Sequence, residues 1–383
     1  MGLIDDRLAA RIRRVGPIGF DELMEAALYD SEVGFYETGG QAGRRGDFVT
    51  SPEIGPLFGA VVARALDDWW AALGEPNPFV VIEAGAGRGA LAAAVRAANP
   101  RCAPALTYVL VDRSAWLRER QREHLELTAP EFALPPSTAA DNDGAAAVPA
   151  AGATGRGPRF VSLPELPAVR IQGVVLANEL LDNVPCRLLE RTGTGWSEVQ
   201  IGLTDGQLPL AEHLTPVSEE LEALANRLAP DARPGARIPL QRQAADWLKN
   251  AFGVLEAGWL VIIDYATSTA ALAERQPEEW LRTYRGHERG GPPLTDLGRQ
   301  DITAEVCTDQ LARVRSLSAD ESQAEFLTRF GIDELVAEGR RIWADRAHVG
   351  DLEAVKARSR VREAEALLDP AGLGGFRVLT WHV

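Results

Sequence analysis

An apolar run followed by three spaced glycines limits most strongly what this chain can fold into. Residues 79–91 read FVVIEAGAGRGAL, and the glycines stand at positions 85, 87 and 89. A strand that leads through a glycine turn into a helix leaves backbone N–H groups pointing outward, where they bind anions and small ligands. Glycine also admits a ligand close to the backbone, because it carries no Cβ. The segment therefore predicts a strand, a ligand-binding turn and a helix.

Strand and helix patterns alternate along the chain from residue 79 onward. Continuous apolar strands that alternate with helices are typical of a parallel sheet covered on both faces. We therefore expect an α/β fold with a doubly wound, mostly parallel sheet. The expected strands are 79–84, 107–113, 159–163, 171–178, 259–266 and 376–383, and the expected helices are 88–99, 114–127, 239–258 and several within 326–368.

The first 75 residues follow a different pattern, which is mostly helical. Apolar residues recur at helical spacing in 17–30 and 54–73, and a loop rich in Gly and Pro lies between these segments. Residues 128–158 are rich in Ala, Gly and Pro and are interpreted as a surface excursion without a function of its own. The expected organisation is a helical N-terminal cap at 1–75 and a core at 76–383, with insertions at about 128–158, 190–235 and 267–370.

The composition of the chain excludes several classes of binding partner and site. The formal net charge of −15 repels phosphate backbones, so a nucleic-acid partner is not expected. No apolar run approaches the ~18 residues of a membrane helix, and the N-terminal segment lacks the apolar centre of a signal peptide, which favours a cytoplasmic location. Cys102, Cys186 and Cys307 are far apart, and the five histidines form no i, i+4 pair. We expect buried thiols and no metal site.

The glycine spacing alone leaves two ligands open. Gly85, Gly87 and Gly89 fit the G-x-G-x-G pattern of a methyltransferase, and Ala90 completes the dinucleotide pattern G-x-G-x-x-G/A. Glu83 would repel a pyrophosphate at this turn but would attract the ammonium and sulfonium of S-adenosylmethionine. The balance favours S-adenosylmethionine, with a nicotinamide dinucleotide as the alternative.

Polar residues also follow the next strands of the expected sheet. Asp112 ends the second strand, where a carboxylate can accept both ribose hydroxyls of an adenosine, so it supports either ligand. ANELLDNVP (177–185) follows the fourth strand and places Asn178, Glu179 and Asp182 near the carboxyl edge of the sheet. Ligands bind at this edge in such sheets. Acidic residues there could also only complement a helix N-terminus, but the position favours a site for Asn178 and Glu179.

These motifs, in this order, resemble the MidA-type S-adenosylmethionine-dependent methyltransferases. The members of that family are bacterial relatives of the mitochondrial complex I assembly factor that dimethylates an arginine. The most specific segments are GDFVTSPEIGPLFG (46–59) and LANELLDNVP (176–185). EAGAGRG (83–89), GWLVIIDYA (258–266) and the weaker LRTYRGH (281–287) accompany them.

The resemblance implies a Rossmann-like class I methyltransferase fold with a helical N-terminal cap and a large insertion before the last strand. It implies arginine N-methylation of a protein, with a respiratory complex I core subunit as the candidate acceptor and a homodimer as one possible assembly. Glu53 and Glu179 are the expected clamp for the guanidinium, supported by Asp182 and Asn178. The expected cofactor-binding residues are Asp47, Thr50, Glu83, Gly85, Ala86, Gly87, Gly89, Asp112 and Asn178.

Departures from the family pattern, two of which follow, keep other functions open. Cys186, Arg187 and Leu188 stand where the family has a hydrophobic residue, Arg and Gln, and Cys307 and Thr308 replace an expected Asp-Phe pair. Both lie in the half that should contact the substrate. A diverged S-adenosylmethionine-binding assembly protein is therefore one alternative, and an NAD-dependent oxidoreductase is another.

Overall fold

The computed structural model describes residues 2–40, 50–134, 157–205, 207–286 and 288–383. The chain forms two compact units, each assembled from three stretches of sequence. Unit 1 takes the described residues of 1–48, 180–249 and 264–316, and unit 2 takes those of 49–179, 250–263 and 317–383. These stretches differ from the expected cap and core, because residues 50–75 belong with the unit that holds the glycine turn.

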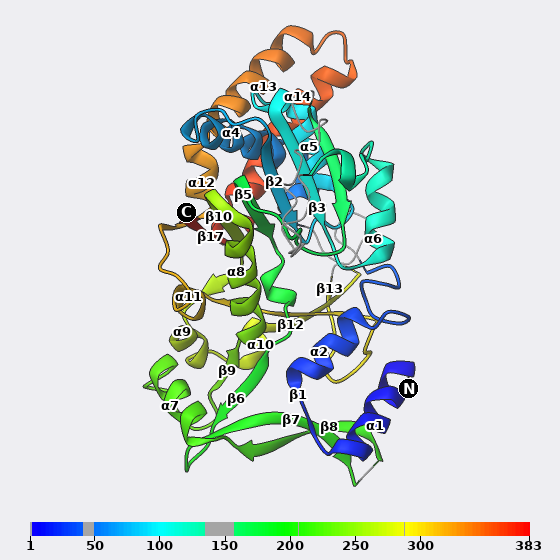
Figure 1. Cartoon of the computed structure of the whole chain (residues 1–383), viewed down its shortest axis with the longest axis vertical. Coiled ribbons are helices and arrows are strands. Elements are labelled where there is room, and N and C mark those ends of the chain that lie inside the picture. The colour runs from blue at the N-terminus through cyan, green and yellow to red at the C-terminus, as the bar shows by residue number, and fades with distance from the viewer. Residues whose placement is uncertain (1, 41–49, 135–156, 206, 287) are drawn as a thin grey trace, which may run out of the picture. The chain divides into compact units, whose positions relative to one another are not determined.

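Unit 2 is built on a mixed, mostly parallel sheet, as the alternation of strands and helices predicts (Figure 1). Pairing is parallel from β10 through β5, β2 and β3 to β4, whereas β16 pairs with β17 antiparallel. In the described chain the order is β16 (Ala319–Ser322), β17 (Arg377–His382), β10 (Leu255–Asp264), β5 (Ile171–Asn178), β2 (Phe79–Ala84), β3 (Leu106–Val111) and β4 (Arg159–Leu163).

The centre of this sheet explains the continuous apolar runs in the sequence. Every residue of β2 and of β3 is buried, as expected for strands covered on both faces. A Cβ on Gly173 of β5 would stand 1.8 Å from the carbonyl oxygen of Val80, so only glycine fits there. The strand order reverses between β2 and β5, because the chain passes from β2 to β3 and β4 on one side before it returns on the other. Such a reversal opens a ligand crevice at the carboxyl ends of the strands.

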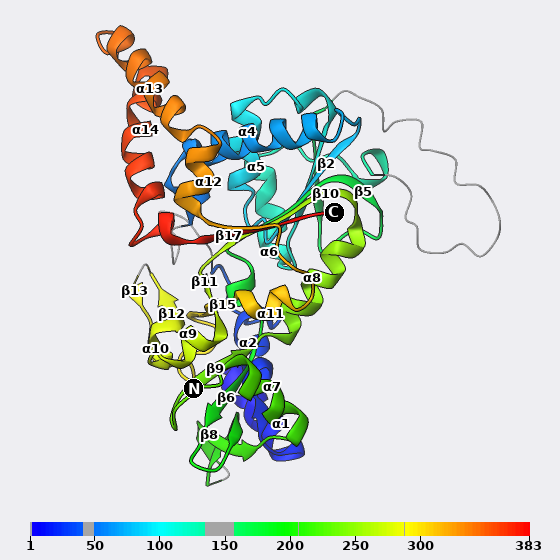
Figure 2. The same cartoon turned by 90° about the vertical axis from the view of Figure 1, so that its left-hand side faces the viewer.

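Helices of unit 2 begin and end where local sequence breaks the helical pattern. The helix expected at 54–73 is divided, since Gly55 and Pro56 separate α3 from α4. A Cβ on Gly59 would stand 2.3 Å from Ala94, so glycine allows α4 to pack closely on α5. Figure 2 shows α13 and α14 side by side. The helices are α3 (Ser51–Ile54), α4 (Pro56–Ala72), α5 (Ala90–Ala98), α6 (Ala115–Arg120), α12 (Gln323–Arg329), α13 (Ile332–Arg346) and α14 (Leu352–Leu368).

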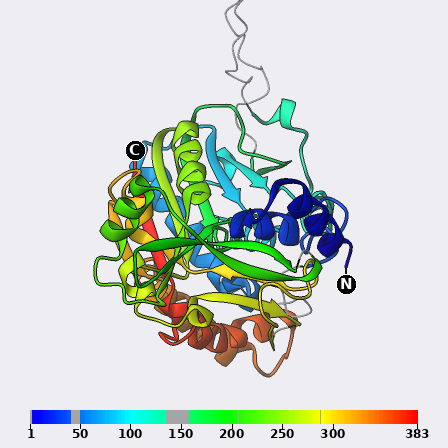
Figure 3. The ribbon, with the colours of Figure 1, turned by 90° about the horizontal axis from the view of Figure 1, so that it is seen from below.

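Unit 1 contains an antiparallel sheet that the sequence patterns did not predict. It lies largely within the segment around 190–235 that was interpreted as a polar excursion. Figure 3 shows its long β7–β8 pair, and α1 and α2 pack against β7. The elements are α1 (Leu3–Val15), β1 (Ile18–Gly19), α2 (Phe20–Tyr29), β6 (Arg187–Arg191), β7 (Trp196–Thr204), β8 (Gln207–Pro216), α7 (Glu219–Leu228) and β9 (Arg237–Leu240).

The second half of unit 1 is made of short elements. The helix expected at 239–258 is α8 (Arg242–Val254), and β10 begins directly after it. A small antiparallel sheet has the order β13–β12–β14, and β11 pairs with β15. These elements are β11 (Ala266–Thr267), α9 (Thr269–Ala273), α10 (Pro277–Trp280), β12 (Leu281–Arg285), β13 (Glu288–Arg289), β14 (Asp301–Ala304), β15 (Val306–Cys307) and α11 (Thr308–Ala312). Among the described helices of both units, none has the length and apolar character to cross a bilayer.

Candidate active site

The glycine turn after β2 has the backbone geometry that its sequence predicts. Gly85, Gly87 and Gly89 have φ values of 70°, 52° and 81°, in the left-handed region that favours glycine. The N–H groups of Gly85 and Ala86 donate to the carbonyl oxygen of Val111 at the end of β3, at 2.9 and 3.1 Å. Added Cβ atoms meet nothing within 4 Å at Gly87, so the surface of the turn is open at this residue.

Asp112 fixes the turn from the neighbouring strand. Its Oδ2 accepts the N–H of Gly87 at 2.9 Å, and its Oδ1 accepts the N–H of Ser114 at 2.9 Å. Gln121 adds a second contact, because its Nε2 donates to the carbonyl oxygen of Gly87 at 3.0 Å. Asp112, which the sequence predicts to bind an adenosine, thus also fixes the shape of the glycine turn.

Glu83 is buried beneath this turn, with 4% of its surface exposed. The hydroxyl of Tyr108 donates to its Oε2 at 2.8 Å. Burial is the main cause that raises the pKa of Glu83 to about 8, and the nearby Asp112 carboxylate adds to the increase, while the hydrogen bond from Tyr108 opposes it. Glu83 is therefore mostly protonated at neutral pH in the ligand-free protein.

Asn178 and Glu179 stand where β5 ends. Glu179 has a φ of 51°, a strained value for a residue with a side chain, and its N–H donates to the carbonyl oxygen of Ile263 at 2.8 Å. Its Oε1 accepts the side-chain amide of Asn178 at 3.1 Å and the backbone N–H of Ser51 at 3.2 Å. The Oδ1 of Asn178 is buried and has no hydrogen-bond partner among the described residues. An orphaned polar atom beside a fixed carboxylate is typical of a binding site.

The contact with Ser51 brings the α3 segment to the end of β5. Thr50 is the N-cap of α3 and is mostly buried, and Glu53 lies two residues beyond Ser51 with a partly exposed side chain. The Ser51 hydroxyl donates to Oε1 of Gln323 at 2.9 Å, and the Nε2 of Gln323 donates to the carbonyl oxygen of Leu367. Buried hydrogen bonds thus hold α3 to α12, and α12 to α14.

Most of the predicted site residues therefore belong to unit 2, at the carboxyl edge of its sheet and on α3. Asp182 is different, because it belongs to unit 1. It is 5% exposed and shares a cluster with Asp264 and Asp301. Burial raises the pKa of Asp182 well above its ordinary value, and the charges of Asp264 and Asp301 raise it further. Asp47 lies outside the described residues.

Three residues of this site were missed by sequence reasoning. Tyr108, Gln121 and Ser51 hold Glu83, the glycine turn and Glu179 in place. Tyr108 and Ser51 stand in segments that were already quoted as a strand and a motif. Tyr108 is a polar-tipped side chain within a buried strand, which was a usable signal, but the partner of each hydrogen bond is remote in sequence.

The departures at Cys186 and Cys307 fall in a hydrophobic core of unit 1. Both thiols are buried and free, as is Cys102. The Sγ of Cys186 lies 4.0 Å from the Sδ of Met24, and the N–H of Cys307 donates to Oε1 of Gln241 at 2.7 Å. These cysteines therefore fill the core, as the sequence predicts for thiols in this chain. Within the described residues, no group of three or more His, Cys, Asp or Glu side chains is arranged so that it could hold a metal ion.

The residues present fit an adenosyl ligand with a methionine end. The turn offers open backbone at Gly87, Asp112 offers carboxylate oxygens beside it, and the orphaned Oδ1 of Asn178 can accept an ammonium proton. Fold and site together define an α/β protein that binds a small adenosine-containing molecule at the carboxyl edge of a mostly parallel sheet.

Comparison with known proteins shows to which family this adenosine-binding α/β protein belongs. The sequence model of a family described as S-adenosyl-L-methionine-dependent methyltransferases matches residues 61–324. The chain belongs to this family, in agreement with the resemblance to MidA-type methyltransferases. S-adenosylmethionine is its cofactor, and methyl transfer is its activity.

Relatives and solved structures agree with the assignment. The protein arginine methyltransferase NDUFAF7 of Bos taurus is 29% identical over 352 residues, with 85% of this chain and 73% of the relative covered. Its Drosophila melanogaster homologue is 28% identical over 320 residues, with 80% and 68% covered. A Burkholderia thailandensis protein solved with S-adenosylhomocysteine superposes with a TM-score of 0.78 at 29% identity, with 99% of this chain and 92% of that chain covered.

Proposed function

We propose that this methyltransferase modifies the guanidinium nitrogen of an arginine in a protein. The observation that carries the proposal is the carboxylate of Glu179, whose Oε1 is fixed by Ser51 and Asn178 where β5 ends. A carboxylate held in one orientation is suited to a planar guanidinium, which binds carboxylates in bidentate fashion. The names of the mitochondrial relatives, which are protein arginine methyltransferases, support the same substrate class.

The proposed chemistry follows from the charge of arginine. Guanidinium has a pKa above ~12, so it reaches the site protonated. Bound S-adenosylmethionine supplies an electrophilic methyl on its sulfonium. Glu179 and Glu53 would hold the guanidinium and align one nitrogen with the methyl carbon. The new bond from nitrogen to the methyl would replace the bond from the methyl to sulfur, which would leave S-adenosylhomocysteine as a neutral thioether. The proton lost from the nitrogen would pass to one of these carboxylates or to water. Positioning of this kind is worth roughly 7–11 kcal/mol in well-oriented reactions.

The remaining site residues receive proposed roles on the cofactor. Gly85, Ala86, Gly87 and Gly89 would lie against its methionine part, with Asp112 on the ribose. Asn178 and Glu83 would face the ammonium end, and Thr50 would cover it. Asp47 would belong to the same cover, on the family resemblance alone. The proposed support of the clamp by Asp182 rests only on its place in ANELLDNVP.

Labelled methyl transfer tests this proposal. The purified protein would be incubated with S-adenosylmethionine that carries a tritiated methyl and with heat-treated bacterial extract as acceptor. Acid hydrolysis of the labelled protein should release radioactive methylarginine. Label in another amino acid would contradict arginine as the substrate. Binding of S-adenosylhomocysteine with no transfer to any protein would favour the diverged assembly protein instead.

The acceptor follows from the resemblance alone, and the location follows from the sequence patterns of the chain. A core subunit of a complex I-type respiratory enzyme is the proposed acceptor, and the cytoplasm is the proposed compartment. Recombinant subunits offered one at a time in the same labelling assay would test the acceptor directly.

A further inference from the structure

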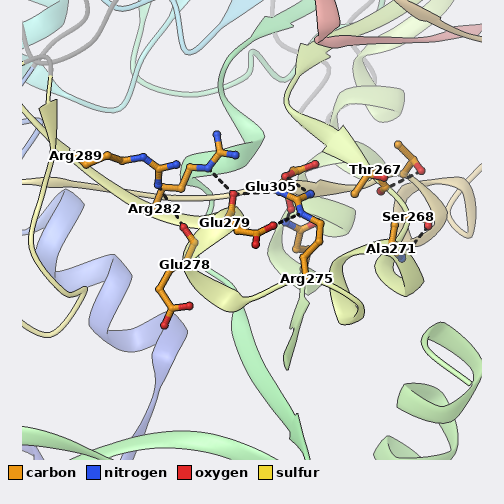
Figure 4. A network of polar contacts seen from close by, with 11 residues as sticks. Thr267, Ser268, Ala271, Arg275, Glu278, Glu279, Arg282, Arg289 and Glu305 are labelled. Carbon is orange, nitrogen blue, oxygen red and sulfur yellow. Dashed lines mark hydrogen bonds and ion pairs between the residues drawn. The ribbon is translucent and has the colours of Figure 1, made fainter. Parts of the chain in front are cut away.

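Two arginines on the β12–β13 hairpin of unit 1 lie outside the site described above. Figure 4 shows Arg282 and Arg289 beside α10. The Nε of Arg282 donates to the carbonyl oxygen of Glu279 at 2.7 Å, and Nη1 of Arg289 donates to that of Glu278 at 3.3 Å. These two carbonyls belong to consecutive residues of α10, so both guanidinium groups are held at the same helix.

Aromatic rings also fix both groups. The Cζ of Arg282 lies 5.7 Å from the ring centre of Tyr265, and the Cζ of Arg289 lies 5.6 Å from that of Tyr284. Tyr284 and Arg289 are paired across the hairpin, which sets the second contact. A guanidinium that is held by a carbonyl and a ring is oriented before any ligand arrives.

The charges of this pair are not neutralised by the described part of the chain. Figure 4 shows the carboxylate of Glu278 pointing away from both guanidinium groups, while that of Glu279 points toward Arg275. Arg275 is different, because it forms ion pairs with Glu279 and Glu305. Arg282 and Arg289 form no ion pair with a described carboxylate, and each bonds only a backbone carbonyl.

This arrangement calls for an anion from outside the chain. Two adjacent like charges repel each other, and an anion that bridges them relieves the repulsion. Each guanidinium carries five N–H donors in a planar fork, and the contacts above use one of them on each arginine. The free donors match the oxygens of carboxylates.

We propose that Arg282 and Arg289 bind an acidic segment of the protein substrate. The proposal rests on the proposed function, since only a protein acceptor would bring such a segment. Carboxylates fit better than a nucleic acid, because the net charge of −15 repels a long run of phosphates but tolerates a short acidic segment. Arg282 also gives a role to the LRTYRGH segment, to which the cofactor site assigns none.

Fluorescence anisotropy on the whole protein tests the proposal. The probe is a fluorescein-labelled peptide with one arginine and six glutamates, and its control has glutamines in place of the glutamates. Arg282→Gln/Arg289→Gln should bind the glutamate peptide about tenfold more weakly than the wild type. All proteins should bind the glutamine peptide equally. Higher salt should weaken only the binding of the glutamate peptide.

The matched control is Arg227→Gln/Arg233→Gln, which removes the same charge from exposed positions of unit 1. An equal loss of affinity for the glutamate peptide in the two double variants would overturn the proposal, because the change in net charge alone would then explain the loss. Arg289→Gln alone changes one exposed side chain and should show part of the loss if the double variant fails to fold. A single-stranded oligonucleotide that binds the wild type but not Arg282→Gln/Arg289→Gln would also overturn it.

Binding is measured here without methyl transfer. Suppose that no methylarginine forms but that only Arg282→Gln/Arg289→Gln loses affinity for the glutamate peptide. This result would reject the proposed function and would retain an acidic binding partner. Methylarginine formation with equal peptide binding in all variants would reject only the arginine pair.

Discussion

The backbone N–H of Ser51 donates to Oε1 of Glu179 at 3.2 Å, although the two residues are 128 positions apart. This contact joins the two most specific motifs of the sequence, since Ser51 belongs to GDFVTSPEI and Glu179 to ANELLDNVP. It explains why both motifs are needed for one site: the first holds the carboxylate that the second supplies.

Glu179→Gln should keep cofactor binding and lose turnover. The amide retains an oxygen for Ser51 and Asn178 but removes the charge that would hold a guanidinium. We expect a fall of about 100-fold or more in the rate of methyl transfer, with an unchanged dissociation constant for S-adenosylhomocysteine. Single-turnover labelling and calorimetry would measure the two quantities. Glu165→Gln, at an exposed position of unit 2, is the control, and normal transfer by Glu179→Gln would remove this carboxylate from the mechanism.

Gly87→Ala should weaken cofactor binding beyond its effect on stability. Left-handed backbone costs a non-glycine residue roughly 1–2 kcal/mol, and the added Cβ would occupy the open face of the turn. Gly74→Ala is a matched control, because Gly74 also has a positive φ, of 80°, and open space around its Cβ. The midpoint temperature of thermal unfolding should fall by a similar amount in both variants, but the affinity for S-adenosylhomocysteine should fall only in Gly87→Ala. Similar affinities in the two would place the ligand elsewhere.

Glu83→Gln should become more stable than the wild type as the pH rises. The pKa of Glu83 is 4.5 in an unfolded chain and about 8 in the folded protein, so between these values only the folded state holds the proton. The wild type therefore loses stability from pH 4.5 to about 8, by roughly 1.4 kcal/mol per pH unit at most. Urea unfolding at pH 5, 6.5 and 8 would show a growing advantage for Glu83→Gln. A constant difference would mean that Glu83 is ionised in the folded protein.

Asp182→Asn in unit 1 should likewise gain stability relative to the wild type as the pH rises. Burial and the neighbouring Asp264 and Asp301 raise the pKa of Asp182 above its ordinary 3.8, so the wild type loses stability as the pH rises from that value. Asparagine stays neutral, and the difference in the free energy of unfolding should grow with pH. The exposed Asp231→Asn is the control. Methyl transfer by Asp182→Asn at the normal rate would restrict Asp182 to a structural role.

The parallel sheet was predictable because its strands are buried on both faces. β2 is confirmed at the residues expected, and the carboxyl ends of β2, β3 and β5 follow from the topology of such sheets. The antiparallel sheet of unit 1 was missed for the opposite reason. β7 alternates polar and apolar residues, but several of its polar side chains are buried, so its pattern is weaker.

The glycine turn and the polar residues at the strand ends were predictable from the sequence, whereas the hydrogen bonds that hold them were not, and the binding roles of these residues stay predictions. Glycine and aspartate at strand ends have few other uses, whereas the bond between Ser51 and Gln323 joins residues 272 positions apart. Asp182 lies three residues after Glu179 but belongs to unit 1, where it is buried beside Asp264 and Asp301. Its place in the proposed site stays a prediction.

A crystal structure with S-adenosylhomocysteine bound tests the central claim most directly. The account predicts the homocysteine part against residues 85–89, the ribose hydroxyls on Asp112 and the sulfur facing the carboxylates of Glu53 and Glu179. A ligand bound away from the glycine turn, or two carboxylates that point away from its sulfur, would contradict the account.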